Sequence, residues 1–427
     1  MNKNWMRLDN AALIFPAVRN NRWVNTFRLS AEMKEEIDPA ILQQAVDELL
    51  PRFPSFYLRL RTGLFWYFLE AVKKTPRVKP EFAYPLTHMS VKEQRQCCFR
   101  VLYHEKRIAV EFFHVLTDGT GGLIYLKTLL ARYTELKYGI RVPAEEGVAD
   151  IREEPRDIEL KDAFQRVSGK YPLSRREATA YRLKGRPDPN GAIHVITGVV
   201  ETERLKAAAS EMDTTVNGFL AAVMMDTIIE IQAAHVREKA RKPVKITVPI
   251  NLRKLFDTET FRNFSLVLNI GVDPRLKDYS LKELCREYGN QLALEAVPEK
   301  MAARIAANVL PQWDIRMRLA PLFLKKLALK MVYNRVGERK GCINISNLGQ
   351  VSLPEELAAC VDRMELMIGV QYIYPNNCAV TSYQGKTYIN IVRNILETEL
   401  ERRFFTRLVR LGIPVRIESG DDEEEES

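Results

Sequence analysis

A histidine between an apolar run and a glycine-rich turn is the feature that most constrains this chain. His114 directly follows residues 107–113, whose apolar side chains predict a buried strand. Asp118 and Gly119 come next, and apolar residues at helical spacing fill residues 123–138. This order predicts a strand, a turn and a helix, with His114 at the end of a rigid element. Functional side chains are commonly found at such positions.

The spacing resembles the His-x-x-x-Asp-Gly motif of the chloramphenicol acetyltransferase-like superfamily. That group includes condensation domains, wax-ester synthases, polyketide-associated acyltransferases and alcohol acetyltransferases. Its usual motif has two adjacent histidines, of which the second is catalytic. Here Phe113 stands at the first position and His114 at the second. The resemblance therefore implies that His114 is the general base of an acyl transfer.

Other segments resemble the same superfamily, and they occur in the same order along the chain. Residues 6–16 resemble the opening of bacterial alcohol acetyltransferases. The Asn-Leu-Arg sequence that ends at Arg253 resembles the family's Pro-Val-Asn-Leu-Arg segment, and residues 346–349 read Ser-Asn-Leu-Gly, as in the family. The Asp-Phe-Gly-Trp-Gly sequence of many relatives is absent. The similarity covers nearly the whole chain, and the alcohol acetyltransferase (wax-ester-synthase-like) branch is nearest.

The resemblance implies an α/β (α+β) fold of two chloramphenicol acetyltransferase-like domains, each a mixed β-sheet flanked by helices. A length of 427 residues agrees with two domains, because single cores rarely exceed about 250–300 residues. We expect an N-terminal domain over residues 1–165 and a linker or crossover over 166–190, where hydrophobic periodicity fades. A C-terminal domain should cover 191–418, and an acidic, disordered tail 419–427.

The motif suggests a role for each residue around His114. Acyl transfer from a thioester needs a base for the acceptor proton, and a neutral imidazole with a pKa of about 6.5 can accept it. The bland alternative is a strand-end histidine satisfied by the backbone. The resemblance implies that Asp118 pairs with Arg253 and holds the loop, although a plain Asp-Gly turn would explain Asp118 equally simply. Gly119 is expected to allow a backbone shape that side chains forbid.

Two further sets of residues are candidates for substrate contacts. Ser346 and Asn347 are candidates for a polar group near the oxyanion or the acceptor. The basic segment 325–340 is a candidate for the phosphates of coenzyme A, through Lys325, Lys326 and Lys330, although such charges are often only a solvated face. The net charge of +9 suits an anionic partner, such as coenzyme A or an acidic carrier protein. No nucleic-acid-binding module is recognisable, so we expect no nucleic acid partner.

The sequence also argues against several classes of protein. It has no run of about 18 apolar residues, so we expect no transmembrane segment, and its N-terminus lacks an apolar signal core. A cytoplasmic monomer is expected. The six cysteines show no Cys-x-x-Cys spacing, and the other histidines are isolated. We therefore expect reduced thiols, no metal site and no permanently bound cofactor.

The leading hypothesis is an O-acyltransferase that moves an acyl group, acetyl in the simplest case, from a coenzyme A thioester to the hydroxyl of a small alcohol. One alternative is a condensation-type acyltransferase with a carrier-protein thioester (a phosphopantetheine arm) and an amine or hydroxyl acceptor. The other is a catalytically degenerate binding protein of the same fold, which Phe113 and the missing Asp-Phe-Gly-Trp-Gly sequence would favour.

Overall fold

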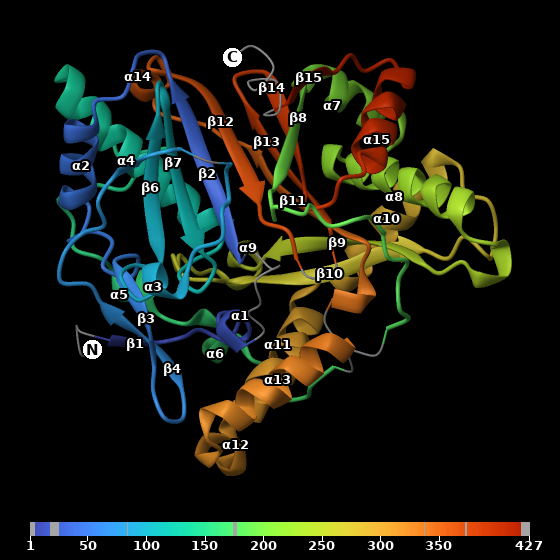
Figure 1. The fold of residues 1–427 in the computed structure, drawn as a ribbon, viewed down its shortest axis with the longest axis horizontal. Coiled ribbons are helices and arrows are strands. Elements are labelled where there is room, and N and C mark those ends of the chain that lie inside the picture. The colour runs from blue at the N-terminus through green and yellow to red at the C-terminus, as the bar shows by residue number, and fades with distance from the viewer. Residues whose placement is uncertain are drawn as a thin grey trace.

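Two mixed β-sheets, one in each of two lobes, organise the molecule (Figure 1). The computed structural model describes residues 5–17, 25–82, 84–173, 177–336, 338–371 and 374–419. Each sheet is covered by helices and has its own hydrophobic core. The expected α/β fold with mixed sheets is confirmed.

The first sheet has five strands in the order β12-β2-β7-β6-β5, antiparallel except for the parallel β5–β6 pair. Its strands are β2 (Thr26–Met33), β5 (Lys79–Pro80), β6 (Phe99–His104), β7 (Arg107–Phe113) and β12 (Val361–Ile368). The strand that delivers His114 is central, and six of its seven residues are buried. A small sheet beside it contains β1 (Trp5–Arg7), β3 (Leu58–Thr62) and β4 (Tyr67–Ala71).

The second sheet has seven strands in the order β10-β9-β11-β13-β14-β8-β15, and the pairs β9–β11 and β11–β13 are parallel. Its strands are β8 (His194–Glu201), β9 (Val244–Asn251), β10 (Ser265–Val272), β11 (Ile343–Gln350), β13 (Asn376–Tyr383), β14 (Lys386–Arg393) and β15 (Arg416–Ser419). Strands β9, β10 and β11 extend toward the first lobe, so their ends lie near the end of β7 (Figure 1).

Helices cover both sheets. The first half of the chain contains α1 (Ile14–Ala17), α2 (Pro39–Glu48), α3 (Val91–Gln94), α4 (Gly119–Tyr138), α5 (Asp157–Leu160) and α6 (Ala163–Val167). The second half contains α7 (Thr202–Glu211), α8 (Val216–His235), α9 (Arg253–Phe256), α10 (Leu281–Glu295), α11 (Pro298–Trp313), α12 (Ile315–Leu319), α13 (Leu322–Val336), α14 (Glu355–Ala358) and α15 (Glu399–Arg410). Short 3-10 turns occupy Glu238–Ala240 and Glu338–Lys340.

Helix α4 begins and ends at residues suited to those positions. The Asp118 carboxylate caps its N-terminus by accepting a hydrogen bond from the Gly121 amide, and Gly139 ends it with a φ of 70°. A left-handed residue after a helix is favourable for glycine because no Cβ clashes there. The turn after His114 is therefore fixed by the start of a 20-residue helix.

Strand β12 departs from the expected division at residue 191. It comes from the C-terminal half of the chain but pairs along its length with β2, at the edge of the first sheet. The next strand, β13, returns to the second sheet. The alternating pattern of a strand indicates that it forms, but it does not say which edge it joins, and this exchange was not expected.

The region between the lobes is partly ordered by ion pairs. Glu159 in α5 accepts two hydrogen bonds from the Arg52 guanidinium, at 2.7 and 2.8 Å, and both side chains are buried. Helix α12 ends at Leu319 and α13 begins at Leu322, because Pro321 between them lacks an amide hydrogen and cannot continue the helical ladder. The disordered tail was expected over residues 419–427. Ser419 is the last residue of β15, and residues 420–427 lie outside the described residues.

Helix α8 is long and apolar enough to cross a membrane by length and composition alone. In the structure, 67% of its most apolar window is buried within the protein. It packs against α7, α10 and α15 as a core helix of the second lobe. In the part of the chain that the structure describes, it is the one helix that meets these criteria.

Candidate active site

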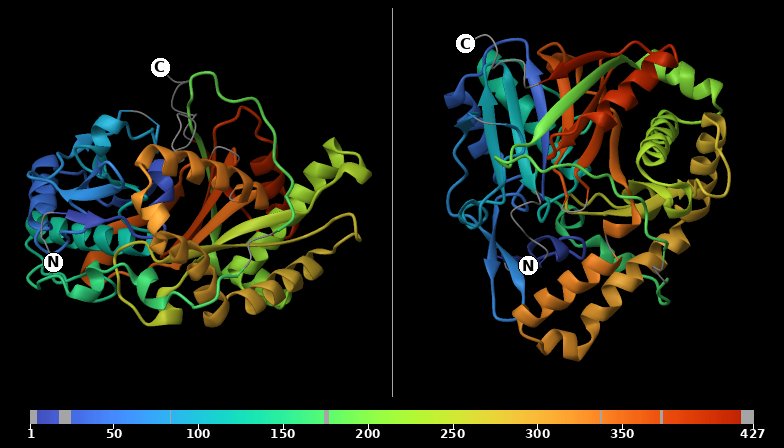
Figure 2. Two further views of the ribbon diagram at one scale, coloured as in Figure 1. Left: turned by 90° about the horizontal axis from the view of Figure 1, so that it is seen from below. Right: turned by 45° about the vertical axis from the view of Figure 1, so that its right-hand side comes forward.

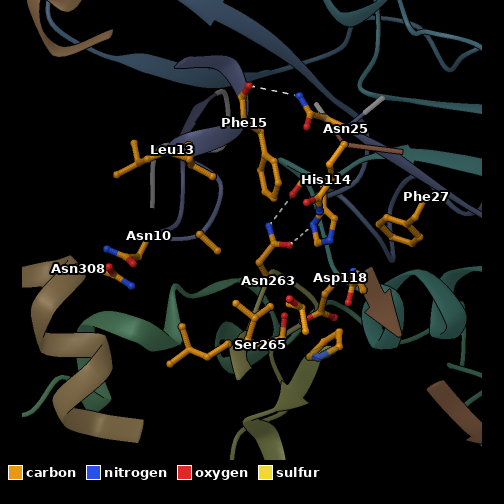
Figure 3. A pocket seen from close by; sticks show the side chains of 18 of the residues that line it. Asn10, Leu13, Phe15, Asn25, Phe27, His114, Asp118, Asn263, Ser265 and Asn308 are labelled. Atoms are coloured by element: carbon orange, nitrogen blue, oxygen red, sulfur yellow. Dashed lines mark hydrogen bonds between the residues drawn. The ribbon is translucent and has the colours of Figure 1, made fainter. Parts of the chain in front are cut away.

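A cavity of about 620 Å³ lies where the two lobes meet, and His114 lines it (Figure 3). The first lobe contributes α1, the start of β2 and the turn before α4, whereas the second contributes β9, β10, β11 and helices α11 and α13. The residues predicted from the sequence that line it are His114, Asp118, Gly119, Ser346, Asn347, Lys325 and Lys326. Arg253 and Lys330 are not part of the lining.

Backbone and aromatic contacts fix the position of His114. Its amide donates to the Asn25 carbonyl at 3.0 Å, which continues the β2–β7 pairing beyond the strand end. Phe15 stacks on the imidazole with a centroid distance of 4.8 Å, and Phe27 meets it edge-on at 5.1 Å. Figure 3 shows these two rings on either side of the imidazole. These two rings limit the contact of the imidazole with water, while His114 still lines the cavity.

Asn263 determines which imidazole nitrogen carries the proton. Its side-chain nitrogen donates to the His114 carbonyl at 2.9 Å and to the Asp9 carboxylate at 3.1 Å. The amide oxygen therefore faces Nδ1 of His114, at 2.9 Å. An amide oxygen only accepts, so Nδ1 must be the protonated nitrogen of the neutral ring. This leaves Nε2 with its lone pair, as a general base requires.

Asp9 orients the side chain of Asn263 by accepting a hydrogen bond from its amide nitrogen. Its carboxylate accepts from the Ala12 amide at 2.8 Å and lies 3.6 Å from the guanidinium of Arg262. Burial raises the pKa of Asp9 to about 7, and the charge of Arg262 only partly opposes this rise. A carboxyl, an amide and an imidazole thus form one hydrogen-bonded series from Asp9 to His114.

The same surroundings keep His114 neutral. Burial lowers the pKa of His114 below 6.5, because removal from water disfavours the charged ring. The negative charge of Asp118 and the hydrogen bond with Asn263 raise the pKa but do not cancel this effect. The lowered pKa favours a neutral imidazole at neutral pH, with Nε2 unprotonated.

The structure brings Asp118 and Arg253 into direct contact across the two lobes. One Asp118 oxygen lies 2.9 Å from an Arg253 nitrogen and also accepts from the Phe264 amide at 2.8 Å. The Arg253 guanidinium also donates hydrogen bonds to the carbonyl oxygens of Thr260 and Arg262. Burial raises the pKa of Asp118, but the Arg253 charge and the hydrogen bonds from Arg253, Phe264 and Gly121 together hold the pKa below the usual value. Both oxygens of the Asp118 carboxylate thus accept hydrogen bonds that hold the loop in place.

The glycines after Asp118 are needed for space. Gly119 lies in the first turn of α4 and is not among the residues with positive φ, so the expected unusual backbone shape at Gly119 is wrong. A Cβ there would lie 3.2 Å from Leu348, at the cavity wall. A Cβ on Gly121 would lie 2.2 Å from the Phe261 carbonyl oxygen. The helix start can approach the second lobe only because this position has no side chain.

Ser346 and Asn347 differ in what their side chains do. Both lie in β11 and line the cavity. The Asn347 oxygen accepts from the Gly349 amide at 2.7 Å and so holds the bulged end of the strand. The side-chain nitrogen of Asn347 lies 3.5 Å from the Asn217 oxygen, so the Asn347 amide is oriented from both ends, and the Ser346 hydroxyl is a second candidate donor beside it.

The three candidate lysines occupy different environments. Lys325 is 5% exposed, donates to the Phe65 carbonyl at 3.0 Å, and lies 3.3 Å from the centre of the Trp66 ring. Burial lowers the pKa of Lys325. Lys326 is exposed at the cavity, and Lys330 is exposed outside its lining. Lys325 thus joins α13 to the β3–β4 loop, which leaves Lys326 as the exposed cation at the cavity.

The sequence reasoning missed Asp9, Phe15 and Asn263. All three stand in segments that resemble the superfamily, but no spacing rule connects residues from three distant segments to one ring. A signal was available at Asn263, because a buried asparagine before a strand needs several partners.

Two of the other histidines that the structure describes form local pairs with acidic side chains. His194 pairs with Asp188 and His235 with Glu399, each at 3.0 Å. Five of the six cysteines are buried, and Cys360 is partly exposed. No cluster of histidine, cysteine and acidic side chains among the described residues could hold a metal ion.

Known structures share this architecture over nearly the whole chain. TRI101 from F. sporotrichioides, solved with coenzyme A and T-2, has a TM-score of 0.64 and 10% identity, covering 94% of this chain and 96% of its own. The starter condensation domain of rhizomide synthetase, a mutant solved with C8-CoA and Leu-SNAC, has a TM-score of 0.60 and 12% identity, covering 95% and 94%. The wax ester synthase/diacylglycerol acyltransferase from Marinobacter aquaeolei VT8 has a TM-score of 0.53 and 12% identity, covering 95% and 100%.

No protein-family model and no curated protein sequence matches this chain. The structural matches are below 25% identity, so they are evidence for the fold. The evidence for the site comes from the motif residues of this chain. Two lobes with mixed sheets, a histidine at the end of a central strand, and an Asp–Arg pair between the lobes occur together. The chain therefore has the two-lobed fold of the chloramphenicol acetyltransferase-like and condensation-domain superfamily.

Proposed function

We propose that this protein is an acyltransferase that moves an acyl group from a coenzyme A thioester to the hydroxyl of a small alcohol, with His114 as the general base. The observation that carries the proposal is the hydrogen bond from His114 Nδ1 to Asn263, because it leaves a basic Nε2 in a cavity between two lobes. A histidine with a structural role alone needs neither a fixed tautomer nor a position in the cavity lining.

In this mechanism His114 acts first as a base and then as an acid. Nε2 takes the proton of the acceptor hydroxyl while that oxygen attacks the thioester carbonyl carbon. The tetrahedral intermediate carries an oxyanion, to which the Asn347 amide and the Ser346 hydroxyl are the candidate donors. The carbon–sulfur bond then breaks, and the proton on Nε2 passes to the departing thiolate. The products are an ester and a free thiol, and His114 returns to its neutral state.

The cavity walls suit two different substrates. Leu13, Phe15 and Leu322 give apolar surface, whereas Asn251 and Asn269 give amide groups. A volume of about 620 Å³ falls within the range of sites for small-molecule ligands, about 300–1,000 Å³. An apolar acyl chain and a polar acceptor fit such mixed walls.

Coenzyme A is the donor that we favour. TRI101 was solved with coenzyme A and the rhizomide synthetase domain with C8-CoA. In this chain Lys326 is exposed at the cavity, where a cation can meet the phosphates of such a donor. A carrier-protein thioester with an amine or hydroxyl acceptor is the variant within the same chemistry, and the basic net charge suits either donor.

The test is release of free thiol from acetyl-CoA and octanoyl-CoA with a panel of alcohols, together with detection of the ester by mass spectrometry. Wild-type protein should release thiol only when an acceptor is present, and His114→Ala should not. The same assay with a phosphopantetheine thioester and amine acceptors distinguishes the donor variant. Binding of a thioester without turnover under all these conditions would instead support a degenerate binding protein.

A further inference from the structure

An exposed apolar surface lies on helices α12 and α13, outside the site described above. We call it the apolar patch, and it consists of Leu64, Ile315, Leu319, Phe323, Leu324, Leu327 and Met331. Phe323 is 70% exposed, Leu319 66% and Leu327 61%. A large side chain exposed alone is ordinary, but a group of them on one face marks an interaction surface.

Helical spacing places these residues on one side. Ile315 and Leu319 are four residues apart in α12, and Phe323, Leu327 and Met331 are four apart in α13. Residues at this spacing share a helix face. The opposite face of α13 points inward, because Leu322, Lys325 and Leu329 line the cavity. Helix α13 is therefore apolar on its outer face as well as its inner one.

The β3–β4 loop belongs to the same surface. The Leu322 amide donates to the Leu64 carbonyl at 3.0 Å, and Lys325 holds the next two residues of the loop. Figures 1 and 2 show the hairpin and the α12–α13 helices side by side at the same end of the molecule. Leu64, which is 73% exposed, thus adds to the patch from a second element.

The charges around the patch are mostly positive, and the exception is Asp314, which caps the N-terminus of α12 beside Ile315. Residues 315–336 contain no acidic residue, and neither do residues 62–69. Arg316, Lys326 and Lys330 are exposed. Lys326 and Lys330 lie one turn apart on α13, between its outer apolar face and its cavity-lining face. Apolar side chains bordered by cations are the composition that binds the surface of an anionic bilayer.

We propose that the apolar patch docks this protein on an anionic lipid surface. Leu319, Phe323 and Leu327 would enter the boundary between headgroups and acyl chains, and Lys326 and Lys330 would meet the phosphates. A second copy of the chain fits less well, because a symmetric contact through this face would bring the same lysines together. The cavity approaches the patch at Lys326, which lines the cavity and is exposed beside the patch, so a docked lipid surface would present apolar substrates at this rim. This last point alone rests on the proposed function.

The experiment is flotation of the full chain with vesicles of phosphatidylcholine, with and without phosphatidylglycerol, in the absence of substrate. Wild-type protein should float with the anionic vesicles and much less with the neutral ones, and added salt should weaken binding. The variant Leu319→Ser/Phe323→Ser/Leu327→Ser should bind the anionic vesicles with an affinity at least about tenfold lower than that of the wild type, because it loses the inserted apolar groups.

The matched control is Leu276→Ser/Leu294→Ser, which removes two exposed leucines from the second lobe. It should bind vesicles like wild type. The proposal is overturned if wild type does not float, if patch and control variants bind equally, or if light scattering shows a dimer that the patch substitutions dissociate. Turnover of acetyl-CoA with a soluble alcohol, measured without vesicles, tests the proposed function separately and should survive in the patch variant.

Discussion

The Nδ1 atom of His114 lies 2.9 Å from the side-chain oxygen of Asn263, which stands 149 residues later in the chain. This contact joins the end of β7 in one lobe to the start of β10 in the other. The contact fixes the proton of His114 on Nδ1. The protonated nitrogen of this ring therefore depends on how the two lobes are arranged. The first two predictions concern these two residues.

Replacing His114 by alanine should lower kcat by about 100-fold or more, because general-base assistance is lost. Initial rates of thiol release measure this, and circular dichroism shows whether the fold persists. For the wild type, kcat/KM should stay level across neutral pH and fall only below the ordinary imidazole range, since burial lowers the pKa of His114. Near-normal turnover in a folded H114A protein would remove His114 from the mechanism.

Replacing Asn263 by leucine should lower kcat about 10-fold or more with little change in KM, because the ring can then adopt the wrong tautomer. The hydrogen bond of Asn263 raises the pKa of His114, so its loss should move the acid limb of the pH–rate profile to lower pH. Asn263→Gln, which keeps an amide, should recover part of the rate. An unchanged profile in a folded N263L protein would mean that Asn263 is only a packing residue.

Asp118 and Arg253 should show coupling in a double-mutant cycle. Each single alanine substitution should cost about 3–5 kcal/mol of unfolding free energy, because it leaves a buried charge without its partner. The double variant should lose less than the sum. Urea unfolding of the four proteins measures this, and strict additivity would show that the pair does not interact in solution.

Asp9 should make stability depend on pH. Its pKa of about 7 in the fold exceeds the value of about 3.9 expected in the unfolded chain, so the folded state retains a proton that the unfolded state loses. The stabilisation is complete at low pH and is lost as pH rises toward and through 7. Asp9→Asn removes this titration. Its stability relative to wild type should increase between pH 5 and 8 in urea unfolding, whereas a constant difference would contradict the raised pKa.

Lys326 and Lys330 should assist donor binding through charge. Their replacement by glutamate should raise KM for acetyl-CoA at low salt and leave kcat nearly unchanged, because exposed charges act over about 10 Å at 0.1 M salt. Lys325 is kept, since its contacts with Phe65 and Trp66 make it part of the framework. The control is Lys206→Glu/Lys239→Glu, an equal charge change on the second lobe. Equal effects of both pairs would show that only net charge matters.

Local features of the fold could be predicted from the sequence because they depend on neighbouring residues. Strand β7 has the predicted bounds, since a continuous apolar run between a turn and His114 leaves little choice. Helix α4 follows from its capping aspartate and apolar spacing. The match of Arg253 to a motif led to its partner Asp118. In each case a short stretch or a known motif contained the information.

Features that depend on distant pairings could not be predicted in this way. Asn263 reaches His114 only because the two sheets meet, and the sequence does not say how they meet. Lys325 looked like a surface cation within a basic segment, but the β3–β4 loop covers it. The sheet that β12 joins could not be predicted for the same reason, since its pattern fits an edge in either sheet.

Strand β12 restricts how the lobes can move. It pairs with β2 in the first sheet, while the Asn390 amide of the second sheet donates to the Leu366 carbonyl at 3.0 Å. Strand β12 belongs to the first sheet alone, although β11 before it and β13 after it belong to the second, so the chain crosses between the lobes on both sides of β12. Separation of the lobes would therefore have to break the contact between Asn390 and Leu366, whereas the pairing of β12 with β2 could stay intact.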